Sequence, residues 1–461
     1  MCGAVGGYNI ALSTVVTPTT AVHPLEYGTE EDFKSAIKEL KETLQHSEFG
    51  GISTDQADLI IHGESPYHHH NQDSGVVVYP RNTEDVVKIV KIANKFRMPV
   101  VPYSGATSLE GQISGHPGGS ICVDMSAMDA ILEIHEADAD LVYQPGVGWM
   151  TVNETLCNKG IPLFFPIDPG PTGCSGTNAV QYGTAKGEWF LNLTVILPSG
   201  EVIKTRRRSR KSAAGFDLAN LFIGAEVHYF CHFPLLFRLA PVPPTTVATV
   251  QFPNVRAAAE AVRQSIDVAG VGASVQRVEL VDDNFMKALN KFGSSKRKYL
   301  EKDGLFFKFQ GHSEAAMKEI AKIAKAVCEK NGGTGFKLAN GQTEADAMWS
   351  NRKNALHIGL SILPGACVPV SKLPELVYET KKDIADAGMP SILVGHAGDR
   401  DFHTFLLQTL QQLKLVSRLL HKNVGLSLEF RSTKKHLVEE VNWGSRPGTV
   451  ELTKNVIRGE I

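Results

Sequence analysis

The stretch PYSGATSLEG (residues 102–111) decides the fold, because it lies where a buried strand gives way to a tight turn. Gly105 and Gly111 let the backbone approach a ligand closely, and successive backbone N–H groups in such a turn form a nest for an anion such as a diphosphate. Hydroxyl groups are supplied by Ser104, Thr107 and Ser108. An ordinary glycine turn explains the same residues equally well. The stretch is neither a GxGxxG fingerprint nor a Walker motif, so nicotinamide and ATP sites are weak interpretations.

The residues before this turn predict a β-α-β unit. GVVVYP (75–80) is typical of a buried strand, and TEDVVKIVKIANKF (83–96) of an amphipathic helix with Thr83 as its N-cap. MPVVPYSG (98–105) predicts the second strand. Such units imply parallel pairing and place ligands at the carboxyl ends of the strands. The turn at 102–111 is therefore expected at a ligand-binding edge.

The rest of the chain divides at Pro241-Val242-Pro243-Pro244, which is rigid and breaks any helix. Before this point the patterns predict a helix at 28–48, strands at 120–126 and 141–149, a helix at 152–160 and a hairpin at 190–205. After it they predict a second region of mostly antiparallel character, with strands at 246–252 and 304–311 and helices at 255–267 and 312–333.

Composition excludes several classes of protein. Hydrophobic residues make up 43% of the chain, charged residues 21%, and the net charge is −2, so nothing in the balance calls for nucleic acid or a membrane surface. The seven cysteines contain no CxxC pair, which indicates a reducing compartment. The basic run TRRRSRK (205–211) lacks interleaved aromatics and is interpreted as a solvated loop. Residues 1–27 lack a basic start and are interpreted as a loose end, with a clipped anchor or presequence as the alternative.

Two further segments carry candidate chemistry. GHAGDRDFH (395–403) places His396 and His403 seven residues apart around a tight turn, where two imidazoles can converge on one ion. That spacing by itself is more often structural. MWSNRKNAL (348–356) carries Arg352 on a helical pattern. A guanidinium holds a carboxylate with two parallel hydrogen bonds, although an ordinary surface arginine explains the residue as well.

Taken together, these motifs resemble a known family. PYSGATSLEG is preceded by VVYPRNTEDVVKIV and followed by ICVDMS, QPGVGW, GCSGTNAVQYGT and NLTVILPSGEVIKT. This pattern resembles the vanillyl-alcohol-oxidase or PCMH-type FAD-binding domain, and within it the D-lactate dehydrogenase (cytochrome) family, close to glycolate oxidase and D-2-hydroxyglutarate dehydrogenase. The resemblance runs from about Gly28 onward.

The resemblance implies an α+β fold in four parts. After a leader (1–27) come a PCMH-type FAD-binding domain of two subdomains (28–241) and an α/β substrate-cap domain (242–400), and then a helical C-terminal region (401–461) that completes the active site. By resemblance, the residues that bind FAD are Pro102, Tyr103, Ser104, Gly105, Ala106, Thr107, Ser108, Leu109, Gly111, Gly173, Ser175, Gly176, Thr177, Asn178, Tyr182 and Gly183.

The activity implied is oxidation of D-lactate to pyruvate, with D-2-hydroxyglutarate as the alternative substrate. Arg352 would grip the substrate carboxylate, and His396 and His403 would bind a divalent metal, Zn or Mn, that polarises the hydroxyl. A base would take the hydroxyl proton while the hydride passes to the flavin. Electrons would then leave to cytochrome c or another acceptor, and the family points to mitochondria.

The chain departs from the family pattern at five places. Four are internal, at Pro171–Gly173, Glu226–Arg238, Cys367–Val368 and His421–Lys434, and the fifth is the end at Ile461, before a closing NPGK segment. The family's GEHG motif, whose glutamate would be a third metal ligand and whose histidine would be the base, is missing from the fourth. Two interpretations remain: a misassigned gene structure for an active enzyme, or a catalytically inactive FAD-binding remnant.

Overall fold

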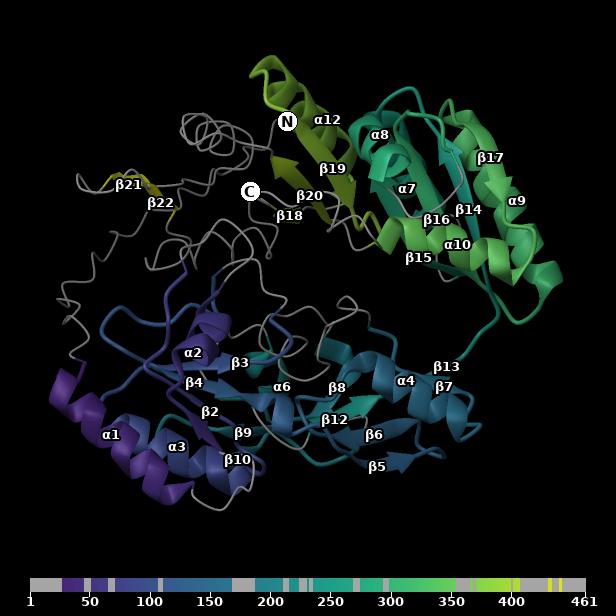
Figure 1. The fold of residues 1–461 in the computed structure, drawn as a ribbon. Coiled ribbons are helices and arrows are strands. Elements are labelled where there is room, and N and C mark those ends of the chain that lie inside the picture. Colours follow the sequence, from purple (N-terminus) through teal and green to yellow (C-terminus); the bar gives the residue numbers. More distant parts are fainter. Residues whose placement is uncertain are drawn as a thin grey trace, which may run out of the picture.

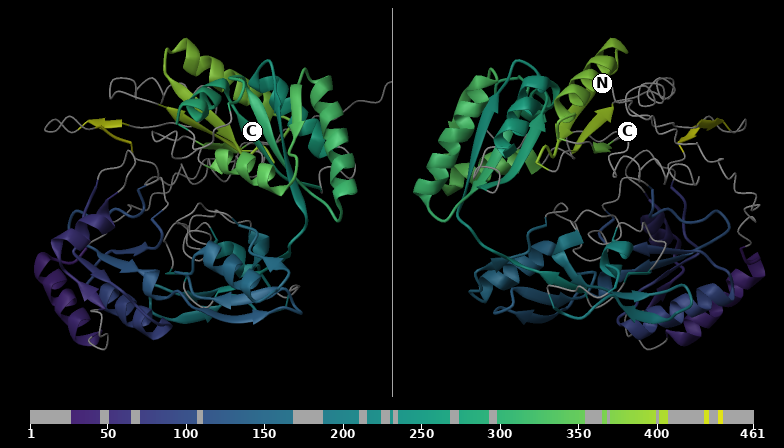
Figure 2. Two further views of the ribbon diagram at one scale, coloured as in Figure 1. Left: turned by 45° about the vertical axis from the view of Figure 1, so that its right-hand side comes forward. Right: turned by 180° about the vertical axis from the view of Figure 1, so that it is seen from behind.

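The computed structural model shows a chain of two lobes (Figure 1). The lower lobe in Figure 1 runs from α1 (Glu30–Thr43) to β13 (Ala240–Pro241), and the upper lobe runs from β14 (Thr245–Gln251) to β20 (Asp401–Leu406). Two further views show the same division (Figure 2). The structure describes residues 27–44, 51–64, 71–106, 111–167, 187–209, 215–223, 230–231, 235–267, 274–292, 298–353, 365–367, 370–398, 401–406, 430–432 and 439–441. Within these ranges no helix has the length and apolar content needed to cross a bilayer.

The first sheet of the lower lobe contains the expected parallel strands in an unexpected order. It runs β1-β2-β4-β3, and both β2 and β3 are parallel to β4. Its strands are β1 (Ile52–Ser53), β2 (Val76–Val78), β3 (Val100–Tyr103) and β4 (Ile121–Asp124). Every residue of β4 is buried, whereas both ends of β3 are partly exposed. The fully buried β4 therefore takes the central position, and β3 takes the edge.

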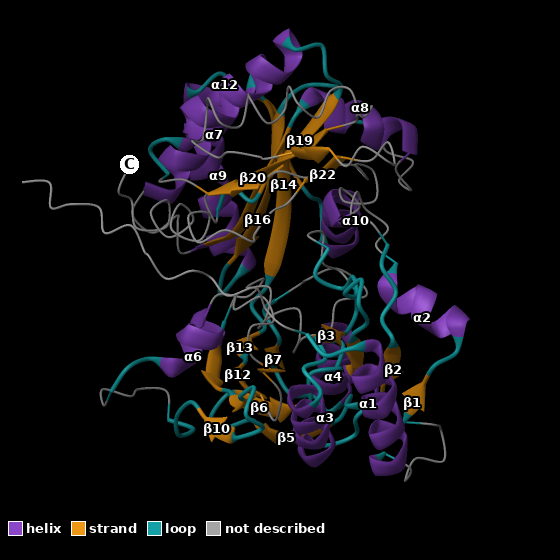
Figure 3. Cartoon of the chain, turned by 90° about the vertical axis from the view of Figure 1, so that its left-hand side faces the viewer, coloured by secondary structure: helices purple, strands orange, loops and turns teal. Residues whose placement is uncertain are grey.

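Helices α1 and α3 (Thr83–Lys95) pack against this sheet through one apolar cluster. The prediction of Thr83 as the N-cap of α3 is wrong by one residue. Asn82 has the extended backbone of an N-cap, and its side-chain oxygen accepts a hydrogen bond from the backbone N–H of Asp85 at 2.9 Å. Helix α2 (Gln56–Gly63) lies on the side of this lobe that faces the upper lobe (Figures 1 and 3).

Two further sheets of at least three strands belong to the lower lobe. Their orders are β5-β6-β12-β8 and β10-β9-β11. The predicted hairpin at 190–205 is confirmed for β9 and β10, but Phe190–Asn192 leaves it and pairs with β12 in the other sheet. The predicted strand at 141–149 ends at Tyr143, and Trp149 begins a helix. The elements are β5 (Ile131–His135), β6 (Asp140–Tyr143), β8 (Phe190–Asn192), β9 (Thr194–Ile196), β10 (Val202–Lys204), β11 (Phe230–Cys231) and β12 (Leu235–Arg238).

Short elements surround these sheets. They are the helices α4 (Trp149–Asn158) and α6 (Leu218–Phe222), the 3-10 helices η1 (Met125–Ala127) and η2 (Gly187–Trp189), and the strand β7 (Leu163–Phe164), which pairs with β13. Aromatic side chains fill the core here, and the rings of Phe165 and Phe237 stack with centroids 4.1 Å apart. Such stacking adds to the stabilisation that burial of the rings provides.

The basic run at 205–211 is only partly the solvated loop that its sequence predicts. Arg206 donates hydrogen bonds to the backbone carbonyl groups of Phe190 and Leu191. Arg208 forms ion pairs with Asp138 at 2.6 Å and with Asp140 at 3.1 Å. The prediction fails for Arg206, which is partly buried because the carbonyl groups of a distant strand supply acceptors for it. Arg208 is 43% exposed, as the prediction expects, although it pairs with these two acids.

The upper lobe is built on a seven-stranded sheet of order β17-β14-β16-β15-β19-β20-β18, and every pairing in it is antiparallel, as the sequence predicts. The remaining strands are β15 (Val275–Val281), β16 (Gly304–Gln310), β17 (Thr334–Leu338), β18 (Gly365–Cys367) and β19 (Ser391–Gly395). The helices are α7 (Val255–Asp267), α8 (Asp283–Phe292), α9 (Glu314–Lys330), α10 (Gln342–Lys353) and α12 (Leu373–Asp386).

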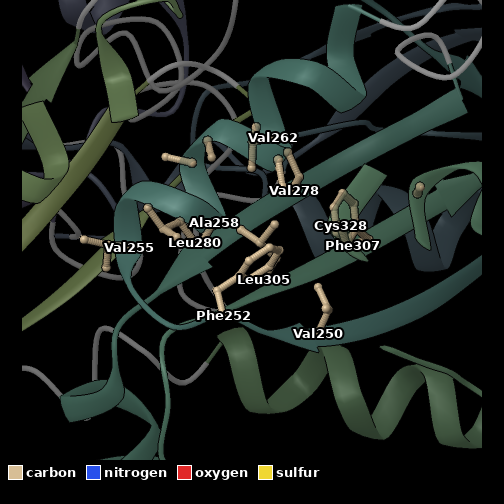
Figure 4. Packing of buried hydrophobic residues seen from close by; sticks show 14 of the residues in the cluster. Val250, Phe252, Val255, Ala258, Val262, Val278, Leu280, Leu305, Phe307 and Cys328 are labelled. Atoms are coloured by element: carbon tan, nitrogen blue, oxygen red, sulfur yellow. The ribbon is translucent and has the colours of Figure 1, made fainter. Parts of the chain in front are cut away.

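Helices cover both faces of this sheet, so alternate strand residues join different cores. Val250, Leu305 and Phe307 pack under α7 and α9 with Cys328 (Figure 4), whereas Phe306 packs on the opposite face under α8 and α10. β20 pairs with β19, so residues 401–406 belong to this sheet. The other described residues beyond 406 form the strands β21 (Phe430–Ser432) and β22 (Glu439–Val441), and helices expected in this region fall outside the described residues.

Candidate functional site

The first part of the candidate site lies at the carboxyl ends of β3 and β4, where the sequence predicts it. β3 ends at Tyr103, and the chain then turns through Gly105 and Ala106, whose φ angles are +57° and +47°. Gly111 also has a positive φ, +74°. The N–H of Ala106 donates to the carbonyl oxygen of Ser104 at 2.6 Å, which closes a tight turn. The sharp turn that the glycines predict is therefore present, and a phosphate group stays the ligand that the sequence predicts for it.

Ser104 supports the same interpretation. Its side chain is 4% exposed, and its hydroxyl has no hydrogen-bond partner within the described ranges. Buried hydroxyl groups are normally paired, so an unpaired one calls for a ligand or another partner at this point. A diphosphate oxygen meets that need, and the described residues of the turn fit FAD in this respect.

Other predicted FAD contacts lie outside the described residues. These are Thr107, Ser108, Leu109, Gly173, Ser175, Gly176, Thr177, Asn178, Tyr182 and Gly183. The departure at Pro171–Gly173 and most of the departures at Glu226–Arg238 and His421–Lys434 lie outside them as well.

The second part of the candidate site is a buried charge cluster in the upper lobe. Arg352, near the end of α10, donates to Glu279 Oε2 on β15 through Nε at 3.1 Å and Nη2 at 2.5 Å. His396, directly after β19, has its Nδ1 3.0 Å from the same carboxylate oxygen and 3.2 Å from Arg352 Nη2. Arg352 and Glu279 are 11% and 6% exposed. The alternative interpretation of Arg352 as an ordinary surface arginine is thus wrong, because its side chain is 11% exposed and forms an ion pair with Glu279.

Glu279 is ionised in this cluster. Burial by itself raises the pKa of Glu279, but the charges of Arg352 and His396 and their hydrogen bonds outweigh burial and lower the pKa to about 2. The sequence analysis missed Glu279. Its signal is a lone acid in the apolar strand VQRVELV, where a carboxylate is retained only if a partner compensates its charge.

His403 joins the cluster from β20. Its ring lies edge-on to the ring of His396, with centroids 5.5 Å apart, so the two histidines converge as the sequence predicts. Burial, together with the nearby His396 and Arg352, lowers the pKa of His403 to about 4, which keeps its ring neutral near pH 7. Its Nδ1 is buried without a hydrogen-bond partner within the described ranges.

A neutral imidazole such as that of His403 is a suitable metal ligand, and its orphaned Nδ1 fits such a role. However, the described part of the chain contains no group of three or more His, Cys, Asp or Glu side chains that could hold a metal ion. α10, which carries Arg352, runs along the side of the upper lobe that faces the lower lobe (Figures 1 and 2).

Each lobe matches a known protein family. The chain matches the FAD binding domain family over residues 74–206 and the FAD linked oxidases, C-terminal domain family over residues 243–436. It is 35% identical over 443 residues to the mitochondrial D-lactate dehydrogenase (cytochrome) of Kluyveromyces lactis, covering 88% of this chain and 74% of that protein. The protein of the same name from Arabidopsis thaliana is 35% identical over 429 residues, with the same coverage.

A solved structure supports the fold alone. p-Cresol methylhydroxylase superposes with a TM-score of 0.70 at 14% identity, covering 86% of this chain and 88% of that one. The PCMH-type α+β fold and the FAD cofactor that the resemblance implies are both confirmed.

Proposed function

The chain belongs to the FAD-linked D-lactate dehydrogenase (cytochrome) family of oxidoreductases, and on this premise we propose that it oxidises D-lactate to pyruvate. The observation that carries the proposal is the cluster of Arg352, Glu279, His396 and His403, in which the Glu279 side chain is 6% exposed and that of His396 is 42% exposed. It supplies a cation for the carboxylate of a small acid and polar nitrogens for its hydroxyl group, in a lobe that faces the FAD-binding lobe.

Arg352 binds the substrate carboxylate in this proposal. Its contacts with Glu279 and His396 use Nε and Nη2, so the two N–H groups of Nη1 are not part of them and would hold the carboxylate. Glu279 keeps the guanidinium in place while the substrate enters. A fixed guanidinium orients the alcohol carbon, and FAD, when bound, supplies the acceptor for the hydride.

His396 and His403 are proposed to hold a divalent metal, Zn or Mn. Glu279 accepts a hydrogen bond from Nδ1 of His396, which would orient the ring toward His403. The neutral ring of His403 would supply a second ligand. Such a metal would polarise the substrate hydroxyl. The family's histidine base would lie in the GEHG segment that this chain lacks, so in this chain the hydroxyl proton would pass to solvent water.

Electron transfer to cytochrome c and a mitochondrial location complete the proposal. Their support is that the relatives from Kluyveromyces lactis and Arabidopsis thaliana are mitochondrial D-lactate dehydrogenases (cytochrome).

Dye reduction by the purified, FAD-loaded protein tests the proposal. We expect turnover of D-lactate, none of L-lactate, and cytochrome c reduction that depends on D-lactate. Turnover of D-2-hydroxyglutarate but not of D-lactate would show that D-2-hydroxyglutarate is the substrate. Bound FAD without turnover of either acid would establish the alternative of an inactive FAD-binding remnant. Arg256→Lys is a matched control for Arg352→Lys, because Arg256 forms a similar ion pair, with Glu379, on the surface of the same lobe.

A further inference from the structure

Helix α2 carries a buried histidine that belongs to none of the groups above. His62 is 5% exposed, and both of its ring nitrogens face oxygen acceptors. Nε2 lies 3.0 Å from the Asp124 carboxylate, and Nδ1 lies 2.8 Å from the backbone carbonyl oxygen of Asp58. Because carboxylates and carbonyl groups only accept, both contacts are hydrogen bonds only when both ring nitrogens carry protons. The geometry therefore favours the imidazolium form of His62.

This imidazolium lies beside the start of the turn at residues 102–111, the phosphate turn. Asp124 is the last residue of β4 and stands opposite Tyr103, the last residue of β3. The rings of His62 and Tyr103 have centroids 4.5 Å apart. Tyr103 directly precedes Ser104, whose buried hydroxyl has no partner within the described ranges. His62 thus contacts the end of β3, from which the turn departs, and the end of β4 beside it.

The same helix end is tied to the far side of the turn. The N–H of Gln72 donates to the carbonyl of Gly63, and the carbonyl of Gln72 accepts from the N–H of Gly115 at 2.7 Å. A Cβ atom at Gly63 would lie 2.5 Å from the oxygen of Gln72, so only glycine permits this approach. His62 and Gly63 therefore connect α2 to both ends of the segment from Tyr103 to Gly115.

We propose that His62 is a positioning residue for FAD, which holds the phosphate turn between its two ends and offsets negative charge where the diphosphate binds. The charges around it come from two acids, Asp58 on α2 and Asp124 on β4. Without the imidazolium, a bound diphosphate would meet this cluster with two carboxylates and no positive charge. Loss of the proton should therefore weaken FAD binding.

The other titratable groups that face His62 keep their protons near neutral pH. Burial raises the pKa of Tyr103 to about 12. Burial and the hydrogen bond with Asp58 raise the pKa of Tyr79 further still. Burial also raises the pKa of the Cys122 thiol. For His62, burial lowers the pKa, but the hydrogen bonds and charges of Asp124 and Asp58 outweigh it and the net shift is upward. His62 is thus the group in this cluster whose charge changes as pH rises from neutral.

FAD release from the purified holoenzyme tests the proposal, and it needs no substrate turnover, so it is separate from the proposed D-lactate activity. His62→Gln keeps a hydrogen-bond donor but removes the charge. We expect FAD affinity to fall on the order of tenfold, measured by flavin fluorescence after dilution at pH 7. The wild-type protein should release FAD more readily as pH rises from 6 to 9, and the variant should show no such dependence.

His135→Gln is the matched control. His135 pairs with Asp140 at 2.8 Å in the same lobe, but on the sheet that does not carry the phosphate turn. We expect wild-type affinity and pH dependence from it. Equal losses in the two variants, or a His62→Gln protein with unchanged affinity and pH dependence, would overturn the proposal.

Asp124→Asn is the second variant, for the case that His62→Gln does not fold. It should shift the pH dependence of FAD release to lower pH, because His62 loses the charge that favours its protonation. An unshifted profile would contradict the proposal.

Discussion

Replacement of Glu279 by Gln isolates the charge at the centre of the upper-lobe cluster. The amide keeps the shape of the side chain but leaves Arg352 buried without its counter-charge. Breaking a buried ion pair from one side costs roughly 3–5 kcal/mol. The pKa of Glu279 gives a similar magnitude: a fall from 4.5 to about 2 corresponds to about 3 kcal/mol of native stability. We expect this loss in the free energy of unfolding in urea at pH 7.

The pH dependence supplies a sharper test. A carboxylate with a lowered pKa stabilises the native state above its unfolded pKa and loses that contribution as pH falls toward its folded pKa. The advantage of the wild-type protein over Glu279→Gln should therefore be constant from pH 7 to about 4.5. Below that it should shrink by roughly 1.4 kcal/mol per pH unit.

The control for this test is Glu260→Gln. Glu260 pairs with Arg263 one helical turn away, and both side chains are about one-third exposed, so we expect a loss of only about 0.5 kcal/mol. The reasoning would be refuted if Glu279→Gln cost no more than this control. A difference that stayed unchanged below pH 4.5 would refute the assignment to the charge.

Three further outcomes follow from the same lobe. Arg352→Lys should lower kcat/KM for D-lactate on the order of a hundredfold with FAD content unchanged, because an ammonium lacks the planar guanidinium that pairs with Glu279 on one side and presents Nη1 to the substrate on the other. Steady-state kinetics beside Arg256→Lys check this. His403→Ala should lower the Zn or Mn content of the purified protein, measured by elemental analysis, and wild-type content would argue against the metal. Burial raises the pKa of Asp282 to about 7, so wild-type stability should fall as pH rises from about 4 to 7. Asp282→Asn should remove this fall and raise the melting temperature at pH 8, and a lower value there would contradict the argument.

Local patterns of the chain predicted the features that depend on near neighbours. The apolar spacing of 312–333 predicted a helix, and α9 begins at Glu314 with Ser313 as its N-cap. The apolar segments TVATVQF and GLFFKFQG predicted strands, and they form β14 and β16. The glycines of PYSGATSLEG predicted a sharp turn, and Gly105 has the positive φ that such a turn requires. Steric limits and helical or strand periodicity act within a few residues, so sequence alone carries this information.

Tertiary structure decided which of these elements became neighbours. Apolar runs show that β2, β3 and β4 are buried, but not that β4 lies between the other two. Nothing local separates Phe190–Asn192 from the hairpin that follows it. The pairs of Glu279 with Arg352 and of His62 with Asp124 span 73 and 62 residues. Hydrogen bonds between strands and buried charges depend on partners brought together only by the folded chain, and one buried charge is stable only where the fold supplies its opposite.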